Sequence, residues 1–136
     1  MGCCGGAQRD EAILNTTNMD ELINVMKKKK SDISVEKQEI QAHLEDPTKK
    51  IGIVTFLECT KEALEKRLPY LDRIGDCYGE CIEKMETIPN LPFNETKEHM
   101  LNIVVHYLIT YDETNQYTKD LAAFKQFAFQ YEQGKK

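Results

Sequence analysis

The chain of 136 residues has no apolar run that approaches the roughly 20 residues of a membrane-spanning helix. Its longest apolar run, residues 103–109, is interrupted by His106. The sequence also lacks a charged start followed by an apolar stretch and a cleavage site, so it predicts no secretory signal. These absences favour a protein of the cytosol, where thiols stay reduced.

An excess of positive charge is also missing. The net charge is −5, whereas a general nucleic-acid binder needs a positive surface to displace counterions from phosphates. No glycine loop followed by Lys-Ser or Lys-Thr is present to hold a phosphate, and no Asp-x-Asp-x-Asp-Gly loop to bind calcium. We therefore expect no nucleic-acid partner, and no catalytic constellation is marked by its sequence surroundings.

The cysteines number five, and the set is Cys3, Cys4, Cys59, Cys77 and Cys81. Cys77 and Cys81 stand four apart on a predicted helix and share a face. Structural zinc sites usually use Cys-x₂-Cys pairs on turns, and free cysteine is among the most buried residue types. We expect this pair to pack in the core and predict no metal or cofactor. A metal or cryptic catalytic site around Cys59, Cys77 and Cys81 is the less favoured alternative.

Helical periodicity predicts an all-α fold, a four- to five-helix bundle in which residues 18–136 form one domain. Residues 18–21 resemble a capping box, and apolar residues then recur at helical spacing up to residue 44. Asp46-Pro47 predicts that this first helix ends near Glu45 and that another begins at the proline.

The clearest pattern is a heptad seam in the middle of the chain. Its positions are Leu57, Leu64, Leu68, Leu71, Tyr78, Ile82 and Met85. Proline inside a helix costs roughly 3 kcal/mol, so Pro69 predicts a kink or a break near Leu68. Gly75 and Gly79 make the same segment thin, which lets another helix approach closely. The heptad seam predicts either the protein's own core or a surface for a partner helix.

Two more helices are predicted after the loop between Pro89 and Pro92. Asn94 is the expected cap of the first, which has a single polar stripe made of Glu98, Asn102, His106 and Thr110. The second repeats the heptad step from Tyr117 to Tyr131.

The most specific functional pattern is the N-terminal sequence Met-Gly-Cys-Cys-Gly-Gly-Ala. Residues 1–17 are rich in glycine at their start and poor in apolar residues, which predicts a flexible tail with one helical turn at Ile13-Leu14. N-myristoylation needs a free glycine with small, uncharged neighbours, and Gly2 fits, although glycine stands at the sixth position where the pattern has Ser or Thr. Cys3 and Cys4 adjoin that acyl chain and are placed for palmitoylation.

Stable membrane binding needs two acyl chains. One myristoyl chain gives binding on the order of only 10⁴ M⁻¹, and a second chain adds roughly 0.8 kcal/mol per buried CH₂. The start resembles that of many dually acylated proteins, and this resemblance of four residues implies lipidation of Gly2, Cys3 and Cys4. Each lysine near anionic headgroups adds about 1 kcal/mol to the free energy of membrane binding. The chain has four consecutive lysines that could contribute in this way, Lys27, Lys28, Lys29 and Lys30. Because consecutive helical residues point in different directions, we favour a solvated helix surface for them.

From these patterns we predict a non-catalytic adaptor or scaffold at the cytosolic face of a membrane. Acyl chains would hold it there, and its bundle would dock another helical protein or a second copy of itself. The alternative is a helical carrier or sensor of a hydrophobic ligand such as an acyl chain. In that case the very apolar predicted helix Met100–Ile109 would line a cavity together with Phe124, Phe127, Phe129 and Tyr131.

Overall fold

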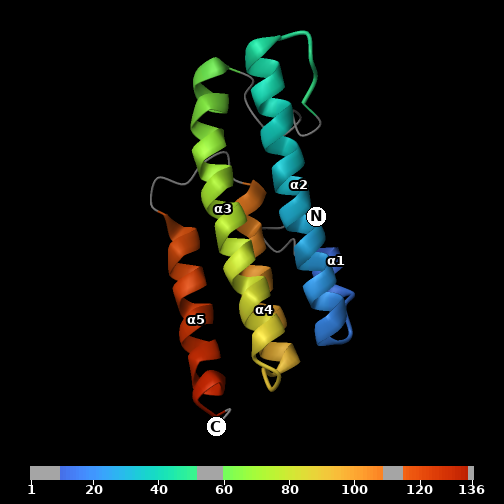
Figure 1. Cartoon of the computed structure of the whole chain (residues 1–136), viewed down its shortest axis with the longest axis vertical. Coiled ribbons are helices and arrows are strands. Elements are labelled where there is room, and N and C mark those ends of the chain that lie inside the picture. The colour runs from blue at the N-terminus through green and yellow to red at the C-terminus, as the bar shows by residue number, and fades with distance from the viewer. Residues whose placement is uncertain (1–9, 52–59, 109–114, 135–136) are drawn as a thin grey trace, which may run out of the picture.

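The computed structural model describes residues 10–51, 60–108 and 115–134 and has the predicted all-α fold (Figure 1). Its elements are α1 (Glu11–Leu14), α2 (Met19–Glu45), α3 (Lys61–Thr87), α4 (Phe93–Val104), the 3₁₀ turn η2 (Val105–Leu108) and α5 (Gln116–Gly134). The described residues contain no strand. They also contain no helix that is both long enough and apolar enough to cross a bilayer.

Helix α2 begins at the predicted capping box. The side chain of Asn18 accepts the backbone N–H of Glu21 at 2.9 Å, and the Glu21 carboxylate accepts the backbone N–H of Thr17 at 2.7 Å. This second bond lowers the pKa of Glu21. The helix ends at Glu45, as predicted. The helix expected at Pro47 does not begin there, because Asp46 instead accepts two hydrogen bonds from Thr48 and closes a turn.

Helix α3 runs without interruption through Pro69, so of the predicted kink or break near Leu68 the break is wrong. The proline ring lies on an exposed side of the helix, while Tyr70 and Leu71 beside it are fully buried. Burying large apolar side chains stabilises by about 1.5–3 kcal/mol each. Packing on both sides of the proline therefore offsets the hydrogen bond that it removes.

The helices form a closed ring. The antiparallel pair α2 and α3 makes the long axis of the molecule, and α3 packs on α5 (Figure 1). Helix α4 packs on α5 and on α1, and α1 packs in turn on α2. The single turn of α1 thus closes the bundle between α2 and α4.

The first described residues, 10–17, belong to the tail expected at residues 1–17, and they pack on α2 and α4. The one predicted helical turn is present as α1, but its Ile13 is fully buried and the adjoining Thr16 is buried as well. Asp10 caps this turn by accepting the backbone N–H of Ile13. Residues 1–9 lie outside the described part of the chain.

The heptad seam lies almost wholly in the protein's own core. Its buried members are Leu64, Leu71, Tyr78, Ile82 and Met85. Leu68 is half-buried, and Leu57 lies outside the described residues. The thin segment faces α2, because a Cβ at Gly75 would meet Ile33 at 3.7 Å and one at Gly79 would meet Lys30 at 3.1 Å. The helix that approaches these glycines closely is therefore α2 of the same chain.

Helix α4 begins at Phe93 after Pro92, and no side chain caps it, so the predicted Asn94 cap is wrong. The polar stripe is confirmed at Glu98 and Asn102, which are exposed, but His106 is 4% exposed. Thr110 lies outside the described residues.

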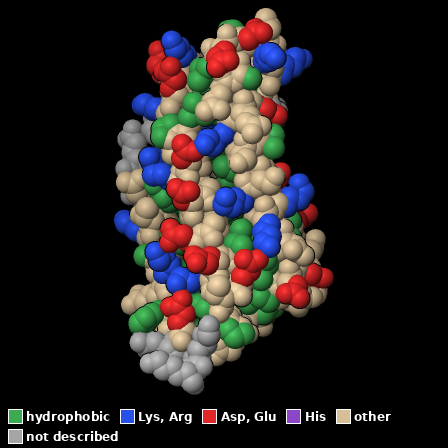
Figure 2. All heavy atoms as spheres, viewed as in Figure 1, with side chains coloured by type: hydrophobic (Ala, Val, Ile, Leu, Met, Phe, Trp, Pro, Cys, Tyr) green, Lys and Arg blue, Asp and Glu red, His purple; other side chains and the backbone are tan. Residues whose placement is uncertain are grey.

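Acidic and basic side chains alternate over the face of the molecule that Figure 2 shows. Ion pairs also join the helices, α2 to α3 at Lys27–Glu86 and Lys37–Asp72, and α3 to α5 at Lys84–Glu132 and Lys125–Glu80. This face consequently carries charge of both signs and no extended patch of one sign.

Candidate functional site

The described part of the chain begins at Asp10, and Gly2, Cys3 and Cys4 precede it in the sequence. The Asp10 carboxylate pairs with Lys29 of α2. At the other end of α1, the Lys97 ammonium of α4 donates hydrogen bonds to the carbonyls of Leu14 at 2.8 Å and Thr16 at 2.9 Å. Because α1 is attached to two other helices, any tether formed by the preceding residues starts from a fixed place on the bundle.

The four consecutive lysines point in different directions, as their helical spacing predicted. Lys27 pairs with Glu86 of α3 at 2.7 Å, Lys28 with Asp32 at 3.5 Å, and Lys29 with Asp10. The end of the Lys30 side chain lies beside Gly79. Three of the four charges thus have a carboxylate partner, and the arrangement adds no support to a membrane-binding role for Lys27–Lys30.

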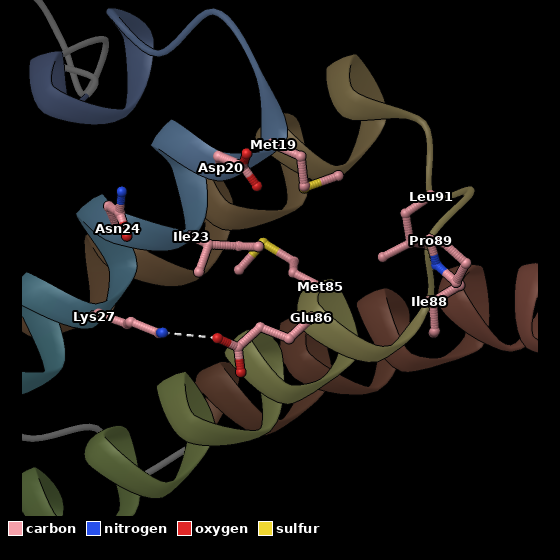
Figure 3. Close-up of a pocket in the computed structure, with 10 residues that line it drawn as sticks. All are labelled: Met19, Asp20, Ile23, Asn24, Lys27, Met85, Glu86, Ile88, Pro89 and Leu91. Atoms are coloured by element: carbon pink, nitrogen blue, oxygen red, sulfur yellow. Dashed lines mark ion pairs between the residues drawn. The ribbon is translucent and has the colours of Figure 1, made fainter.

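A groove of about 720 Å³ lies between the first turns of α2 and the last turns of α3 (Figure 3). We call it the α2–α3 groove, and its lining residues are Met19, Asp20, Ile23, Asn24, Lys27, Met85, Glu86, Ile88, Pro89 and Leu91. Its floor is apolar, since Ile23, Met85, Ile88 and Leu91 are between 2% and 9% exposed. The volume is within the range of about 300–1,000 Å³ that is typical of ligand sites.

The rim of the α2–α3 groove is charged. Lys27 and Glu86 form their ion pair across one side, with 53% and 44% of their side chains exposed (Figure 3). Asp20 is exposed as well and has no hydrogen-bond or ion-pair partner among the described residues. The rim therefore has one negative charge that is not compensated within that part of the chain.

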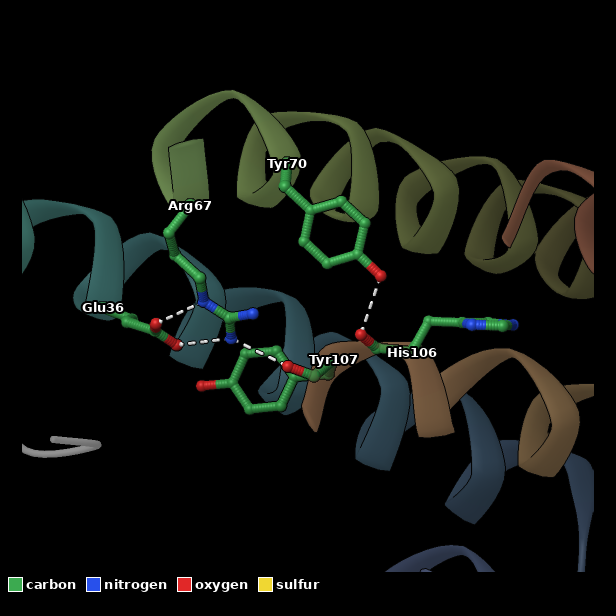
Figure 4. Close-up of polar contacts among 5 residues, drawn as sticks. All are labelled: Glu36, Arg67, Tyr70, His106 and Tyr107. Carbon is green, nitrogen blue, oxygen red and sulfur yellow. Dashed lines mark hydrogen bonds and ion pairs between the residues drawn. The ribbon is translucent and has the colours of Figure 1, made fainter. Parts of the chain in front are cut away.

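A buried polar network ties α2, α3 and η2 together (Figure 4). The Arg67 guanidinium, fully buried, donates from Nε to Glu36 at 2.9 Å and from Nη2 to the Tyr107 carbonyl at 2.7 Å. Tyr70 donates its hydroxyl to the His106 carbonyl at 2.8 Å. The last carbonyls of a helix lack partners within that helix, and here α3 supplies the donors. The network stabilises η2 and presents no exposed reactive group.

His106 joins η2 to α5. Its Nε2 lies 2.6 Å from the Asp120 carboxylate, while its Nδ1 is buried and has no hydrogen-bond partner among the described residues. A histidine–carboxylate pair activates a nucleophile only when a hydroxyl or thiol is within hydrogen-bond reach of the free nitrogen. The described residues place no such group there, so the visible role of this pair is to attach α5.

The two cysteines on α3 lie in the core. Cys77 and Cys81 are buried free thiols, and the hydrogen bond between them together with burial raises the pKa of Cys81. Because the thiolate is the nucleophile and the metal ligand, nucleophilic attack and metal binding are disfavoured at Cys81. Among the described residues no cluster of three or more histidine, cysteine or acidic residues is arranged to hold a metal ion. Cys59 lies outside those residues.

The aromatic residues of α5 pack mainly against one another and against α4. The Phe127 ring lies 4.9 Å from His99 and 5.2 Å from Tyr131 between ring centroids, and Phe124 is fully buried. Phe129 is 52% exposed, so it cannot line an internal cavity as the carrier hypothesis expected. That hypothesis otherwise remains a prediction.

Sequence reasoning missed the buried ion pair and the α2–α3 groove. A signal for the pair was present, because Glu36 stands between Ile33 and Ile40 at helical spacing, and Arg67 stands likewise between Leu64 and Leu71. The groove had no such signal, because it depends on how two distant helix ends meet. Comparisons of the chain with protein-family models, with curated proteins and with solved structures found no match.

Proposed function

We propose that this chain is a membrane-anchored helical adaptor. Acyl chains on Gly2 and on Cys3 or Cys4 hold it at the cytosolic face of a membrane, and its bundle docks a partner protein there. The observation that carries the proposal is the acylation-competent sequence Gly-Cys-Cys-Gly-Gly placed ahead of a bundle.

The attachment of α1 supports a short tether. An extended chain spans at most about 3.3–3.6 Å per residue, so the eight steps from Gly2 to Asp10 reach roughly 30 Å at most. Asp10 is fixed on the bundle by Lys29 and by the buried Ile13. Lipids at the start of the chain therefore keep the bundle within about that distance of the membrane surface.

The burial of the α3 cysteines supports selective palmitoylation. A thiol must be accessible and deprotonated to accept an acyl group. Cys77 and Cys81 are buried, so they do not compete for the lipid. The acceptor thiols must come from the other three cysteines, and Cys3 and Cys4 are the two that adjoin the myristoylation site.

Metabolic labelling with clickable myristate and palmitate analogues tests the proposal. We expect the wild-type chain to carry both labels, with hydroxylamine removing only palmitate because it cleaves thioesters. Gly2→Ala should lose both labels and leave the membrane fraction. A Cys3→Ser, Cys4→Ser double variant should keep myristate but bind membranes only reversibly, because one acyl chain is a marginal anchor.

Gly5→Ala is the matched control, since it makes the same substitution in the same segment but leaves Gly2 intact. It should behave as the wild type in both assays. A Gly2→Ala variant that stays on membranes, or a wild-type chain without either label, would refute the lipid anchor.

A further inference from the structure

We propose that the α2–α3 groove is the docking site for the partner, and that the partner presents a basic amphipathic helix. The helix would insert an apolar side chain into the groove and place a lysine or arginine beside Asp20. The membrane location of this event rests on the proposed function, whereas the site itself is argued from the described residues alone.

The floor of the groove suits an apolar anchor. Ile23, Met85, Ile88 and Leu91 provide a floor whose side chains are already largely covered, and Met19 is a half-buried wall. Methionine is unbranched and polarizable, so Met19 and Met85 can adjust to side chains of different shape. Most of the apolar area removed from water on docking would belong to the partner, so we expect weak binding, with a Kd above about 10 µM.

The rim selects the charge of the partner. Asp20 has no compensating cation among the described residues, and the Lys27–Glu86 pair beside it remains partly in water. A basic side chain next to the anchor would pair with Asp20, whereas an acidic one would be repelled. The overall charge of −5 acts in the same direction, because complementary charge favours encounter.

The groove also lies away from the tether. Lys27 lines the groove, and Lys29 holds α1. Two residues advance an α-helix by about 200°, so these lysines lie on nearly opposite sides of α2. A partner can therefore occupy the groove while the lipid anchor is engaged.

Methionine methyl NMR of the full, non-acylated chain tests the site. Met19 and Met85 report on the groove, while Met26 and Met100, both fully buried, report on the core. The probe is a synthetic helical peptide of leucine and lysine, and its counterpart has glutamate in place of lysine. We expect saturable shifts at Met19 and Met85 with the basic peptide, and binding of the acidic peptide at least tenfold weaker.

Reversing the rim charge provides the second arm. Asp20→Lys should weaken binding of the basic peptide at least fivefold and strengthen binding of the acidic peptide. Asp76→Lys is the matched control, because it makes the same change at an exposed site of α3, nine residues before Met85. It should leave both affinities within a factor of two, and thermal melting confirms that each variant is folded.

Several outcomes would overturn the docking site. These are equal shifts with both peptides, shifts that extend to Met26 and Met100, or affinities that Asp20→Lys does not change. If free myristate shifts the Met19 and Met85 methyl resonances and the peptide does not, the groove binds an acyl chain and not a partner helix. Because these titrations use the non-acylated chain, their failure is separate from failure of the lipid anchor, which Gly2→Ala measures in cells.

Discussion

At the residue scale, Glu36 and Arg67 connect three elements through a few buried atoms. Removing a charge from water costs several kcal/mol, and partners must offset this cost. Arg67 has the Glu36 carboxylate and the Tyr107 carbonyl as acceptors, and its guanidinium also lies 5.3 Å from the Tyr107 ring centroid. Burial raises the pKa of the Tyr107 hydroxyl, which stays protonated at neutral pH. The cluster therefore contains one compensated pair of charges and no third charge.

Breaking the buried pair should be costly. Glu36→Gln leaves the Arg67 charge buried without a counter-charge, so we expect a loss of about 3–5 kcal/mol in the free energy of unfolding, measured by urea denaturation. Replacing both residues, Glu36→Leu with Arg67→Met, should cost less than Glu36→Gln alone. The Lys37–Asp72 pair joins the same two helices nearer the surface, and its removal should cost less than about 1 kcal/mol. If Glu36→Gln lowered the free energy of unfolding by no more than removal of the Lys37–Asp72 pair does, Glu36 would not be needed to compensate the buried charge of Arg67.

His99 should make stability depend on pH. Its ring packs against Phe124 and Phe127, and burial lowers its pKa below the ordinary value of about 6.5. The unfolded chain therefore binds a proton more readily than the native one. The contribution of neutral His99 to the free energy of unfolding is complete above pH 6.5, and it is lost as the pH falls through the native pKa. The urea midpoint should drop between pH 7.5 and 5.5, and the drop should be smaller in His99→Gln. An equal drop in both proteins would refute the assignment.

At the element scale, helix existence followed from periodicity, while some boundaries did not. The end of α2 at Glu45 was predictable because Asp46-Pro47 marks it locally. The continuity of α3 through Pro69 was not, because it depends on packing against α2 on both sides of the proline. The turn α1 was predicted as local structure, but the helix α4 on which it packs is remote in sequence, as the bond from Lys97 to Leu14 shows.

The thin segment of α3 leaves room for small additions. A Cβ at Gly75 would make an ordinary contact of 3.7 Å with Ile33, and one at Gly79 would displace only the flexible end of Lys30. Since alanine exceeds glycine in helix propensity by about 0.8–1 kcal/mol, Gly75→Ala should stabilise by roughly that amount. Gly79→Ala should increase the stability by less, because the end of the Lys30 side chain must move. Thermal denaturation of the two variants checks this order, and Gly75→Leu, which overfills the contact, should destabilise.

At the scale of the whole molecule, sequence patterns identified the apolar faces but not their neighbours. The heptad seam was compatible with an internal core or with a partner helix, and only the packing of α3 on its neighbours shows that its described residues lie mostly in the protein's own core. The α2–α3 groove likewise arises where residues far apart in sequence, such as Ile23 and Met85, meet at one end of the bundle. The periodicity of a single segment does not show which residues of another segment it will contact.

The compact core should protect two thiols. Cys77 and Cys81 are 2% and 0% exposed, so they react with an alkylating reagent only when the bundle opens. Mass spectrometry after brief iodoacetamide treatment should find both unmodified in the native protein and modified in denaturant. Labelling in native conditions at the denatured rate would show that α3 is not packed as described.

The order in which α1 meets its partners has a consequence for biosynthesis. Lys97, which holds the end of α1, follows Leu14 by 83 residues. At about 5–20 residues per second, a ribosome needs roughly 4–17 s to synthesise that interval. During this time α1 has no α4 to pack against. An enzyme that modifies residues 1–9 of the nascent chain, as the proposed function requires, would have those seconds to act before the bundle closes.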